Sequence, residues 1–177
     1  MSELLKQHIF KNGLNLGAIL VFITISTYLG GPELVTNYTV SFGSLLVMIV
    51  FPIYHTRKFR IQSNGFISFK QAFTSCTGIL IAAGFINVAA SILLYNVIDP
   101  AFAIEMLDVV INKMVSQLES LGMNESQIEE SIKALEESSS FDPISLFKGY
   151  LFSIIFYTLF GLLVAAFTKN ENPEFSE

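Results

Sequence analysis

Four long stretches of the chain lack ionisable side chains and are rich in apolar residues. The stretches without Asp, Glu, Lys or Arg contain 21, 23, 28 and 20 residues, at 12–32, 34–56, 71–98 and 149–168. About 20 mostly apolar residues suffice for a helix to cross the hydrocarbon core of a bilayer. Helices of a soluble bundle keep a charged face toward water, and these stretches have none. The pattern predicts an all-α membrane protein with four transmembrane helices, at about residues 13–31, 36–55, 71–98 and 144–168.

The segment at 99–142 has a different pattern, in which apolar residues repeat every three or four positions. This spacing is typical of one face of a helix and joins six residues that we call the predicted association face: Ile104, Leu107, Ile111, Met114, Leu118 and Leu121. Asp99-Pro100 is a typical helix start, and Asn124 is placed to start a second helix. The sequence therefore predicts a helical hairpin here, inserted into a single membrane domain that comprises residues 1–177.

The predicted association face is larger than the short second helix can cover. Its remaining surface can pack within the monomer, lie on the membrane, or bind a second copy or another membrane or envelope protein. The acidic polar side of the hairpin disfavours the membrane surface, where helices prefer Lys and Arg. Packing within the monomer and association with a partner both stay open.

Composition and charge narrow the class of protein further. Hydrophobic residues make up 52% of the chain and charged residues 14%, and the formal net charge is −5. An average soluble domain carries about 25% charged residues. These values exclude a disordered chain, a basic nucleic-acid-binding domain and an ordinary soluble enzyme. The single Cys excludes an internal disulfide and a thiolate metal cluster.

The basic residues predict which ends of the helices face the cytoplasm. Four of them, without any acid, lie between the second and third spans: Arg57, Lys58, Arg60 and Lys70. Lys6 and Lys11 precede the first span, whose length favours an uncleaved helix over a signal peptide. Cytoplasmic loops are rich in Lys and Arg, so both termini are expected in the cytoplasm and the hairpin outside it. The four basic residues between the spans are also candidates for contacts with lipid headgroups.

Uncharged polar residues on the third span form a candidate polar site within the membrane. The set is Asn87, Ser91, Tyr95 and Asn96. Such residues can line a path for a solute, and Asn87 can alternatively form an interhelical hydrogen bond. Gly13 and Gly17 share one face of the first span, which favours close packing of helices within the bundle.

Residue patterns that would indicate catalysis are missing. The sequence contains no His, Cys and carboxylate spacing typical of a metal site, no nucleotide-binding loop and no nucleophile motif. No Asp, Glu, Lys or Arg lies within the four uncharged stretches, and His55 lies at the end of the second. We therefore expect no catalytic residue, no metal site and no cofactor, and we expect the protein not to be an enzyme.

Three segments carry a resemblance to a known family. They read GFISFKQAF at 65–73, IDP at 98–100 and LGMNESQIE at 121–129. Together with the four spans, they resemble the small bacterial membrane protein family catalogued as domain of unknown function 4199, of Bacteroidota type. The resemblance covers nearly the whole chain. It implies a multi-pass protein of the bacterial inner membrane, and it does not indicate any activity.

Two functional hypotheses follow from these features. The favoured one is a non-enzymatic assembly or accessory protein, whose hairpin binds a second copy or another membrane protein. The alternative is a transporter or pore for a small neutral solute, acting as an oligomer. Membrane lipids are expected partners in both cases, and nucleic acid is not.

Overall fold

Each predicted span is one long helix in the computed structural model, which describes residues 2–138 and 141–170. The four helices are α1 (Glu3–Leu29), α3 (Tyr38–Gln62), α4 (Phe69–Leu93) and α7 (Pro143–Thr168). α4 continues directly into the π-helical turn η1 (Leu94–Ile98). By length and composition, all four helices can cross a membrane. The protein is therefore a multi-pass membrane protein, and the predicted all-α fold with four spans is confirmed.

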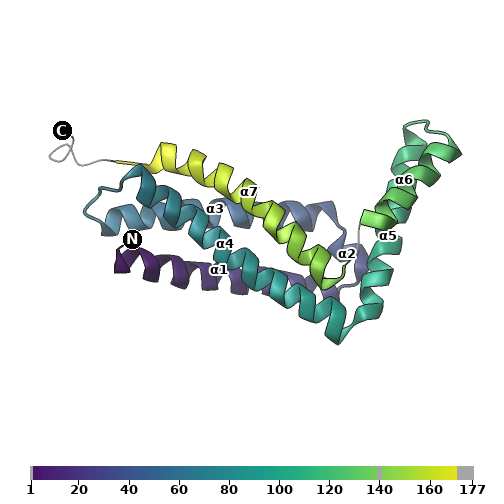
Figure 1. Ribbon diagram of the computed structural model, residues 1–177, viewed down its shortest axis with the longest axis horizontal. Coiled ribbons are helices and arrows are strands. Elements are labelled where there is room, and N and C mark those ends of the chain that lie inside the picture. The colour runs from purple at the N-terminus through teal and green to yellow at the C-terminus, as the bar shows by residue number, and fades with distance from the viewer. Residues whose placement is uncertain (1, 139–140, 171–177) are drawn as a thin grey trace.

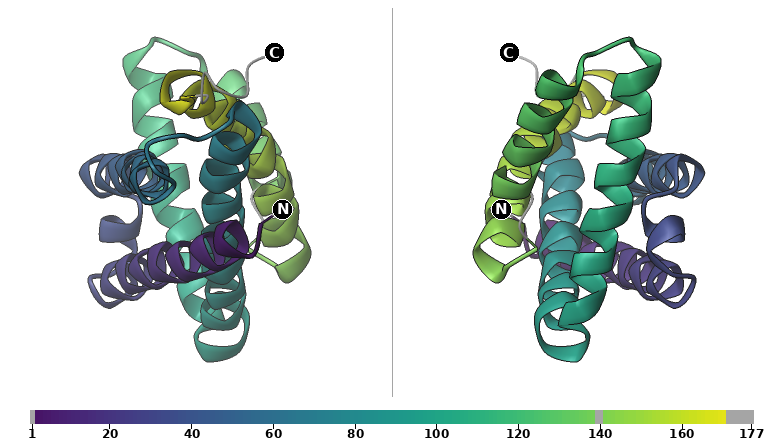
Figure 2. Two further views of the ribbon diagram at one scale, coloured as in Figure 1. Left: turned by 90° about the vertical axis from the view of Figure 1, so that its left-hand side faces the viewer. Right: turned by 90° about the vertical axis from the view of Figure 1, so that its right-hand side faces the viewer.

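α4 is the central helix of the bundle. It lies between α1 and α7, and both of these helices pack along it (Figures 1 and 2). α3 lies to one side and packs less extensively against the other three helices. Its apolar stretch is also more exposed than that of α4. Of the four long helices, α3 is therefore the one that the bundle holds least tightly.

Glycines allow α1 and α4 to approach each other closely. A Cβ atom on Gly13 would lie 2.6 Å from the Cβ of Ala82, and one on Gly17 would lie 2.8 Å from the Cδ1 of Ile86. Real Cβ atoms do not come this close, so only glycine fits at both positions. Membrane helices associate through such small-residue faces because packing, rather than water exclusion, holds them together. The predicted role of this face in packing within the bundle is confirmed.

Two helices extend beyond the spans predicted from the sequence. α1 begins at Glu3 rather than near residue 13, and α3 ends at Gln62 rather than near residue 55. The hydroxyl of Ser2 accepts a hydrogen bond from the backbone N–H of Leu5 at 3.3 Å and so caps α1. A lack of charge marks the hydrocarbon core, whereas a helix ends only where its backbone hydrogen bonds end. Both helices therefore continue past their apolar parts.

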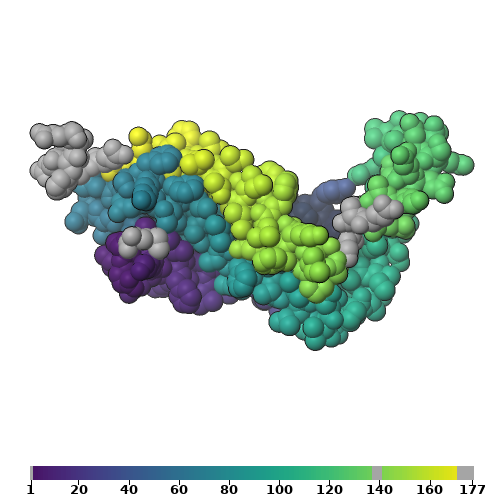
Figure 3. All heavy atoms as spheres, in the orientation of Figure 1, coloured from purple at the N-terminus to yellow at the C-terminus, as the bar shows by residue number. Residues whose placement is uncertain are grey.

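The segment after η1 forms the predicted hairpin of α5 (Pro100–Ser120) and α6 (Glu125–Ser138). The Asp99 side chain caps α5 by accepting from the backbone N–H of Phe102 at 3.2 Å. Asn124 and Gln127 form a reciprocal cap at the start of α6, with distances of 3.0 and 3.2 Å. α6 stands clear of the bundle in Figure 3 and packs on α5. The helix starts predicted from these residues are confirmed.

The two ends of the bundle carry different elements. The start of α1 and the end of α7 lie at one end, whereas the short α2 (Pro32–Val35) and the base of α5 lie at the other (Figure 1). Near the end of α7, Ile67 and Asn170 exchange backbone hydrogen bonds of 2.8 and 2.9 Å. This isolated bridge is the only β-type pairing among the described residues. It fastens the link between α3 and α4 to the end of α7.

Candidate functional site

The structure divides the predicted polar site into two parts. Asn87 and Ser91 line a cavity of about 320 Å³ between α1, α3, α4 and α7, which we call the membrane cavity. Tyr95 and Asn96 lie apart from it in η1. Tyr95 is buried against α5 at the base of the hairpin, and the Asn96 amide donates to the backbone carbonyl of Phe141 at 3.0 Å. The first pair therefore faces a cavity, whereas the second pair holds the base of the hairpin.

Uncharged polar groups from all four long helices line the membrane cavity. The polar residues are Thr24, Ser44, Asn87, Ser91, Tyr150, Ser153 and Tyr157. None of the lining residues is Asp, Glu, Lys, Arg or His. The cavity lies in the half of the bundle nearer to α2 and α5, because its α1 residues are close to the end of that helix. The site therefore offers hydrogen bonds without offering charge.

Several of these polar groups are already paired within the protein. The Thr24 hydroxyl donates to the Asn87 side-chain oxygen at 3.0 Å, which joins α1 to α4. The Tyr150 hydroxyl donates to the backbone carbonyl of Ile81 at 3.0 Å and joins α7 to α4. The Ser44 and Ser153 hydroxyls donate to carbonyls of their own helices. The predicted interhelical hydrogen bond of Asn87 is therefore confirmed.

Three polar groups at the membrane cavity have no partner among the described residues. They are the amide nitrogen of Asn87, the hydroxyl of Ser91 and the hydroxyl of Tyr157. Within a membrane-spanning bundle, an unpaired polar group costs several kcal/mol because no bulk water is present to satisfy it. A cavity with such groups holds polar guests, either water or a small polar molecule.

Small residues create the space for the membrane cavity. A Cβ atom on Gly84 would lie 3.1 Å from the Tyr157 hydroxyl, so this glycine lets the tyrosine ring lie against α4. Gly149 lines the cavity and has open space beside it. One turn after Tyr157, Gly161 instead packs directly against Thr77 of α4. Of the two α7 glycines, Gly149 therefore leaves space for the cavity, and Gly161 allows close contact between α7 and α4.

His, Cys, Asp and Glu side chains are not among the described residues that line the membrane cavity. Among the described residues, no group of three or more His, Cys, Asp or Glu side chains is placed to hold a metal ion. The single cysteine, Cys76, is buried in the apolar core of the bundle. The chemistry that the membrane cavity can perform is therefore hydrogen bonding to an uncharged molecule.

Comparison with known proteins identifies a family. The profile described as "Protein of unknown function (DUF4199)" matches residues 11–170. The chain belongs to this family. No curated protein and no solved structure matches the chain. The match runs from the first turns of α1 to the end of α7, so both the bundle and the hairpin are parts of the DUF4199 unit.

The basic residues of this DUF4199 protein have different surroundings. Arg57, Lys58 and Lys70 are exposed at the end of the bundle that holds the start of α1. Arg60 is half-buried, and its guanidinium donates to the backbone carbonyl of Thr168 at 3.3 Å. Arg60 therefore satisfies a carbonyl at the end of α7, where a cation also interacts favourably with the helix dipole. The other three remain candidates for headgroup contacts.

The predicted association face of the DUF4199 hairpin is partly covered. Its central residues are half-buried, and its two terminal residues, Ile104 and Leu121, are exposed. The most buried residues of α5 are instead Phe102 and Met106, which pack on Tyr28 and neighbouring side chains. Met106 does not belong to the predicted association face. It is buried because the base of α5 rests on η1 and α2, which no helical repeat can reveal.

A polar clamp also fixes α5 beside α2. The Lys113 ammonium lies 3.2 Å from a carboxylate oxygen of Glu33 and 2.6 Å from the hydroxyl of Thr36. Gln117 donates to the Tyr38 hydroxyl at 2.8 Å, one turn further along α5. These contacts join residues that are far apart in the sequence. They hold α5 at a fixed place on the end of the bundle.

Proposed function

We propose that this DUF4199 protein binds a small uncharged polar solute in the membrane cavity and lets it cross the membrane, without performing chemistry on it. The observation that carries the proposal is the set of unpaired groups on Asn87, Ser91 and Tyr157. Together they offer hydrogen bonds of both directions, since an amide nitrogen donates and hydroxyls both donate and accept. The absence of charge at the site favours a neutral solute over an ion. The cavity lies within one chain, so binding itself needs no second copy.

A second cavity supports passage as well as binding. It has a volume of about 530 Å³ and lies between α1 and α3, at the opposite end of the bundle. Along these helices, Leu16 and Phe51 fall between the residues that line the two cavities, and both belong to the same apolar core cluster. Because α3 is the least tightly held helix, its movement would open this apolar layer. A polar chamber on each side of a movable apolar barrier is an arrangement suited to gated transfer.

Flux measurements in liposomes test the proposal directly. Purified full-length protein should accelerate the swelling of liposomes, followed by light scattering, for at least one member of a panel of small polyols and amides. Protein-free liposomes provide the baseline for each solute. Rates that equal the baseline for every member of the panel would contradict the proposal.

Association through the hairpin is a second candidate function. It is favoured by the exposure of Ile104 and Leu121, whose side chains are 66% and 76% exposed. Replacing both with Glu should reduce the mass of the complex that mild detergent extracts from the native membrane. Replacing the exposed Ser116 and Ser120 with Glu adds the same charge to the polar side of α5 and should leave the mass unchanged. An unchanged mass for the first variant would count against association by this face.

We further propose that the protein lies in a bacterial inner membrane with both termini in the cytoplasm. The proposal is supported by Arg57, Lys58 and Lys70, which are exposed at the end of the bundle where α1 begins and α7 ends. A reporter that is active only in the cytoplasm should be active when fused after Glu177. The same reporter inserted at Gly122, in the turn of the hairpin, should be inactive. The reverse result would require the opposite orientation.

A further inference from the structure

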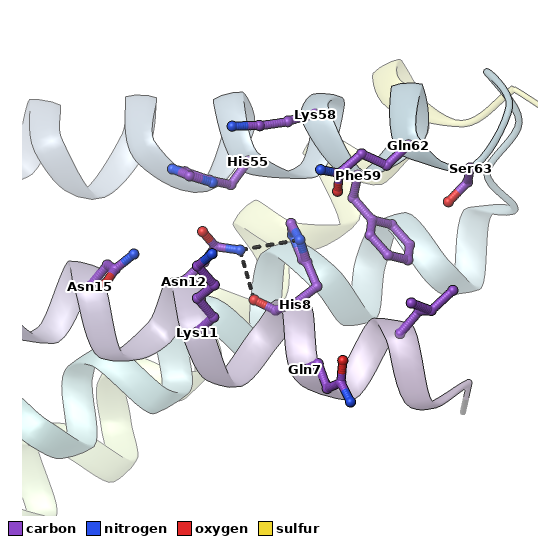
Figure 4. Close-up of a pocket in the computed structure, with 11 residues that line it drawn as sticks. Gln7, His8, Lys11, Asn12, Asn15, His55, Lys58, Phe59, Gln62 and Ser63 are labelled. Carbon is purple, nitrogen blue, oxygen red and sulfur yellow. Dashed lines mark hydrogen bonds between the residues drawn. The ribbon is translucent and has the colours of Figure 1, made fainter.

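Basic side chains gather at the second cavity, which we call the basic cavity. It is lined by α1 near its start and by α3 near its end, and the two helices face each other across it (Figure 4). Its titratable lining residues are His8, Lys11, His55 and Lys58. No Asp or Glu lines it, and neither lysine has an ion-pair partner among the described residues. The cavity therefore has a positive potential that the protein itself does not neutralise.

Uncharged donors surround these basic groups. The side chains of Gln7, Asn12, Asn15, Gln62 and Ser63 also line the basic cavity. Each of them carries at least one N–H or O–H donor. Cationic groups and neutral donors in one cavity are the combination that binds the oxygens of an anion through several hydrogen bonds.

The hydrogen bonds of Asn12 determine which nitrogen of His8 carries the proton. One Asn12 side-chain atom lies 2.7 Å from the backbone carbonyl oxygen of His8 and 3.1 Å from the His8 Nδ1 atom. A carbonyl oxygen only accepts, so this atom is the amide nitrogen, which also donates to Nδ1. Nδ1 is therefore an acceptor, and the proton of the neutral ring is on Nε2.

This arrangement leaves a buried donor without an acceptor. The Nε2 atom of His8 is buried and has no hydrogen-bond partner among the residues that the structure describes. The ring extends from α1 toward α3, with its centre 4.7 Å from the ring centre of Phe59 and 6.4 Å from that of His55 (Figure 4). An unpaired buried N–H costs about 1–3 kcal/mol, so native proteins retain one mainly where something else pairs with it. An oxyanion that enters the basic cavity can supply the missing acceptor when the His8 ring turns toward it, since Nε2 is enclosed in the present arrangement.

We propose that the basic cavity binds a phosphate group between α1 and α3. Lys11 and Lys58 supply the charge, His8 supplies an oriented donor, and the side-chain amides bind the remaining oxygens. The phosphate can belong to a free anion or to the headgroup of an anionic lipid, because the cavity lies at the end of two membrane-spanning helices. Either source would join α3, the least tightly held helix, to α1. The proposal rests on the lining of the basic cavity alone and does not require that this cavity also form part of a solute path.

Histidine NMR gives a direct readout, because His8 and His55 are the only two histidines of the chain. The full-length protein is labelled with ¹⁵N-histidine and placed in phosphatidylcholine nanodiscs in a phosphate-free buffer. One sample is titrated with inorganic phosphate. A second series replaces part of the phosphatidylcholine with phosphatidylglycerol and contains no free phosphate. The proposal expects a saturable shift of the His8 Nε2 resonance in at least one series.

Two lysine variants separate a built site from general charge attraction. Lys58→Gln removes a lining cation and should weaken binding about tenfold, as the loss of one charge-assisted hydrogen bond predicts. Lys169→Gln removes the same charge at the same end of the bundle, from an exposed residue that does not line the cavity, and should bind like the wild type. A shift with phosphate alone would assign a free anion, and a shift with phosphatidylglycerol alone would assign a lipid headgroup. No His8 shift in either series, or equal weakening by both variants, would overturn the proposal.

Discussion

Replacing Asn87 with Leu should abolish most of the solute flux through the reconstituted protein. The substitution removes the unpaired amide nitrogen of the membrane cavity and puts an apolar side chain of similar size in its place. A solute group that then stays unpaired in the cavity costs about 2 kcal/mol, which is roughly a 30-fold loss of rate. The measurement is the swelling rate of liposomes with the solute that the wild type passes best.

Thr24→Val is the matched control for this variant. It removes the hydrogen bond between Thr24 and Asn87 but keeps the Asn87 amide. Interhelical hydrogen bonds in membranes contribute about 0.6 kcal/mol on average, so this variant should lose only about threefold in rate. If both variants lose the same flux, Asn87 acts only by joining α1 to α4, and the solute-binding role is wrong.

Gly13→Val should strongly destabilise the bundle. Its Cβ atom would meet the Cβ of Ala82 at 2.6 Å and the backbone carbonyl oxygen of Ile79 at 3.5 Å. Neither neighbour can rotate away, because one atom is a β-carbon and the other is backbone. Forcing α1 away from α4 should lower the free energy of unfolding by about 1–3 kcal/mol. Titration of the protein in mixed micelles with a denaturing detergent measures this value.

Gly43→Val controls for the helix propensity of the new residue. Gly43 lies on α3, and a Cβ atom there meets nothing within 4 Å. Both substitutions introduce the same side chain into a membrane-spanning helix, so their difference reports the α1–α4 contact alone. Gly43→Val should change the free energy of unfolding by about 0.5 kcal/mol or less. Equal losses in the two variants would mean that the close approach of α1 and α4 does not contribute to stability.

The peripheral position of α3 connects the two sites. Both cavities lie along α3, one near each end, and both are bounded by α1 on the other side. A ligand in either cavity would therefore contact both α1 and α3. This is why the flux assay and the histidine assay are best run on the same variants. A change that moves α3 should register in both.

The charge pattern predicted the four spans because a bilayer excludes ionisable side chains so strongly. The helix bounds were less accurate at Glu3 and Gln62, since hydrogen bonding continues into the polar region beyond the hydrocarbon. Caps such as Asp99 and Asn124 were predicted correctly because they depend on a few neighbouring residues. Interactions between close neighbours of this kind can be predicted directly from the sequence.

The polar site was predictable only in part. All four residues on the third span were polar, yet Asn87 and Ser91 face the membrane cavity and Tyr95 and Asn96 do not. The π-helical turn at 94–98 changes the helix register between the two pairs, and it carries no clear sequence signal. The residues of α1 and α7 that meet Asn87 and Ser91 at the cavity are distant in the chain. The residue pattern of a single helix therefore cannot predict them.

The sequence by itself therefore determined the class of the protein, its spans and its helical hairpin. These features follow from interactions with the bilayer or between close neighbours in the chain. The tertiary structure decided which polar groups are paired, which face a cavity, and where four basic side chains from two helices meet without an acid. These features depend on how separate helices rotate and pack, because a free amide or a positive cavity exists only once its neighbours are in place.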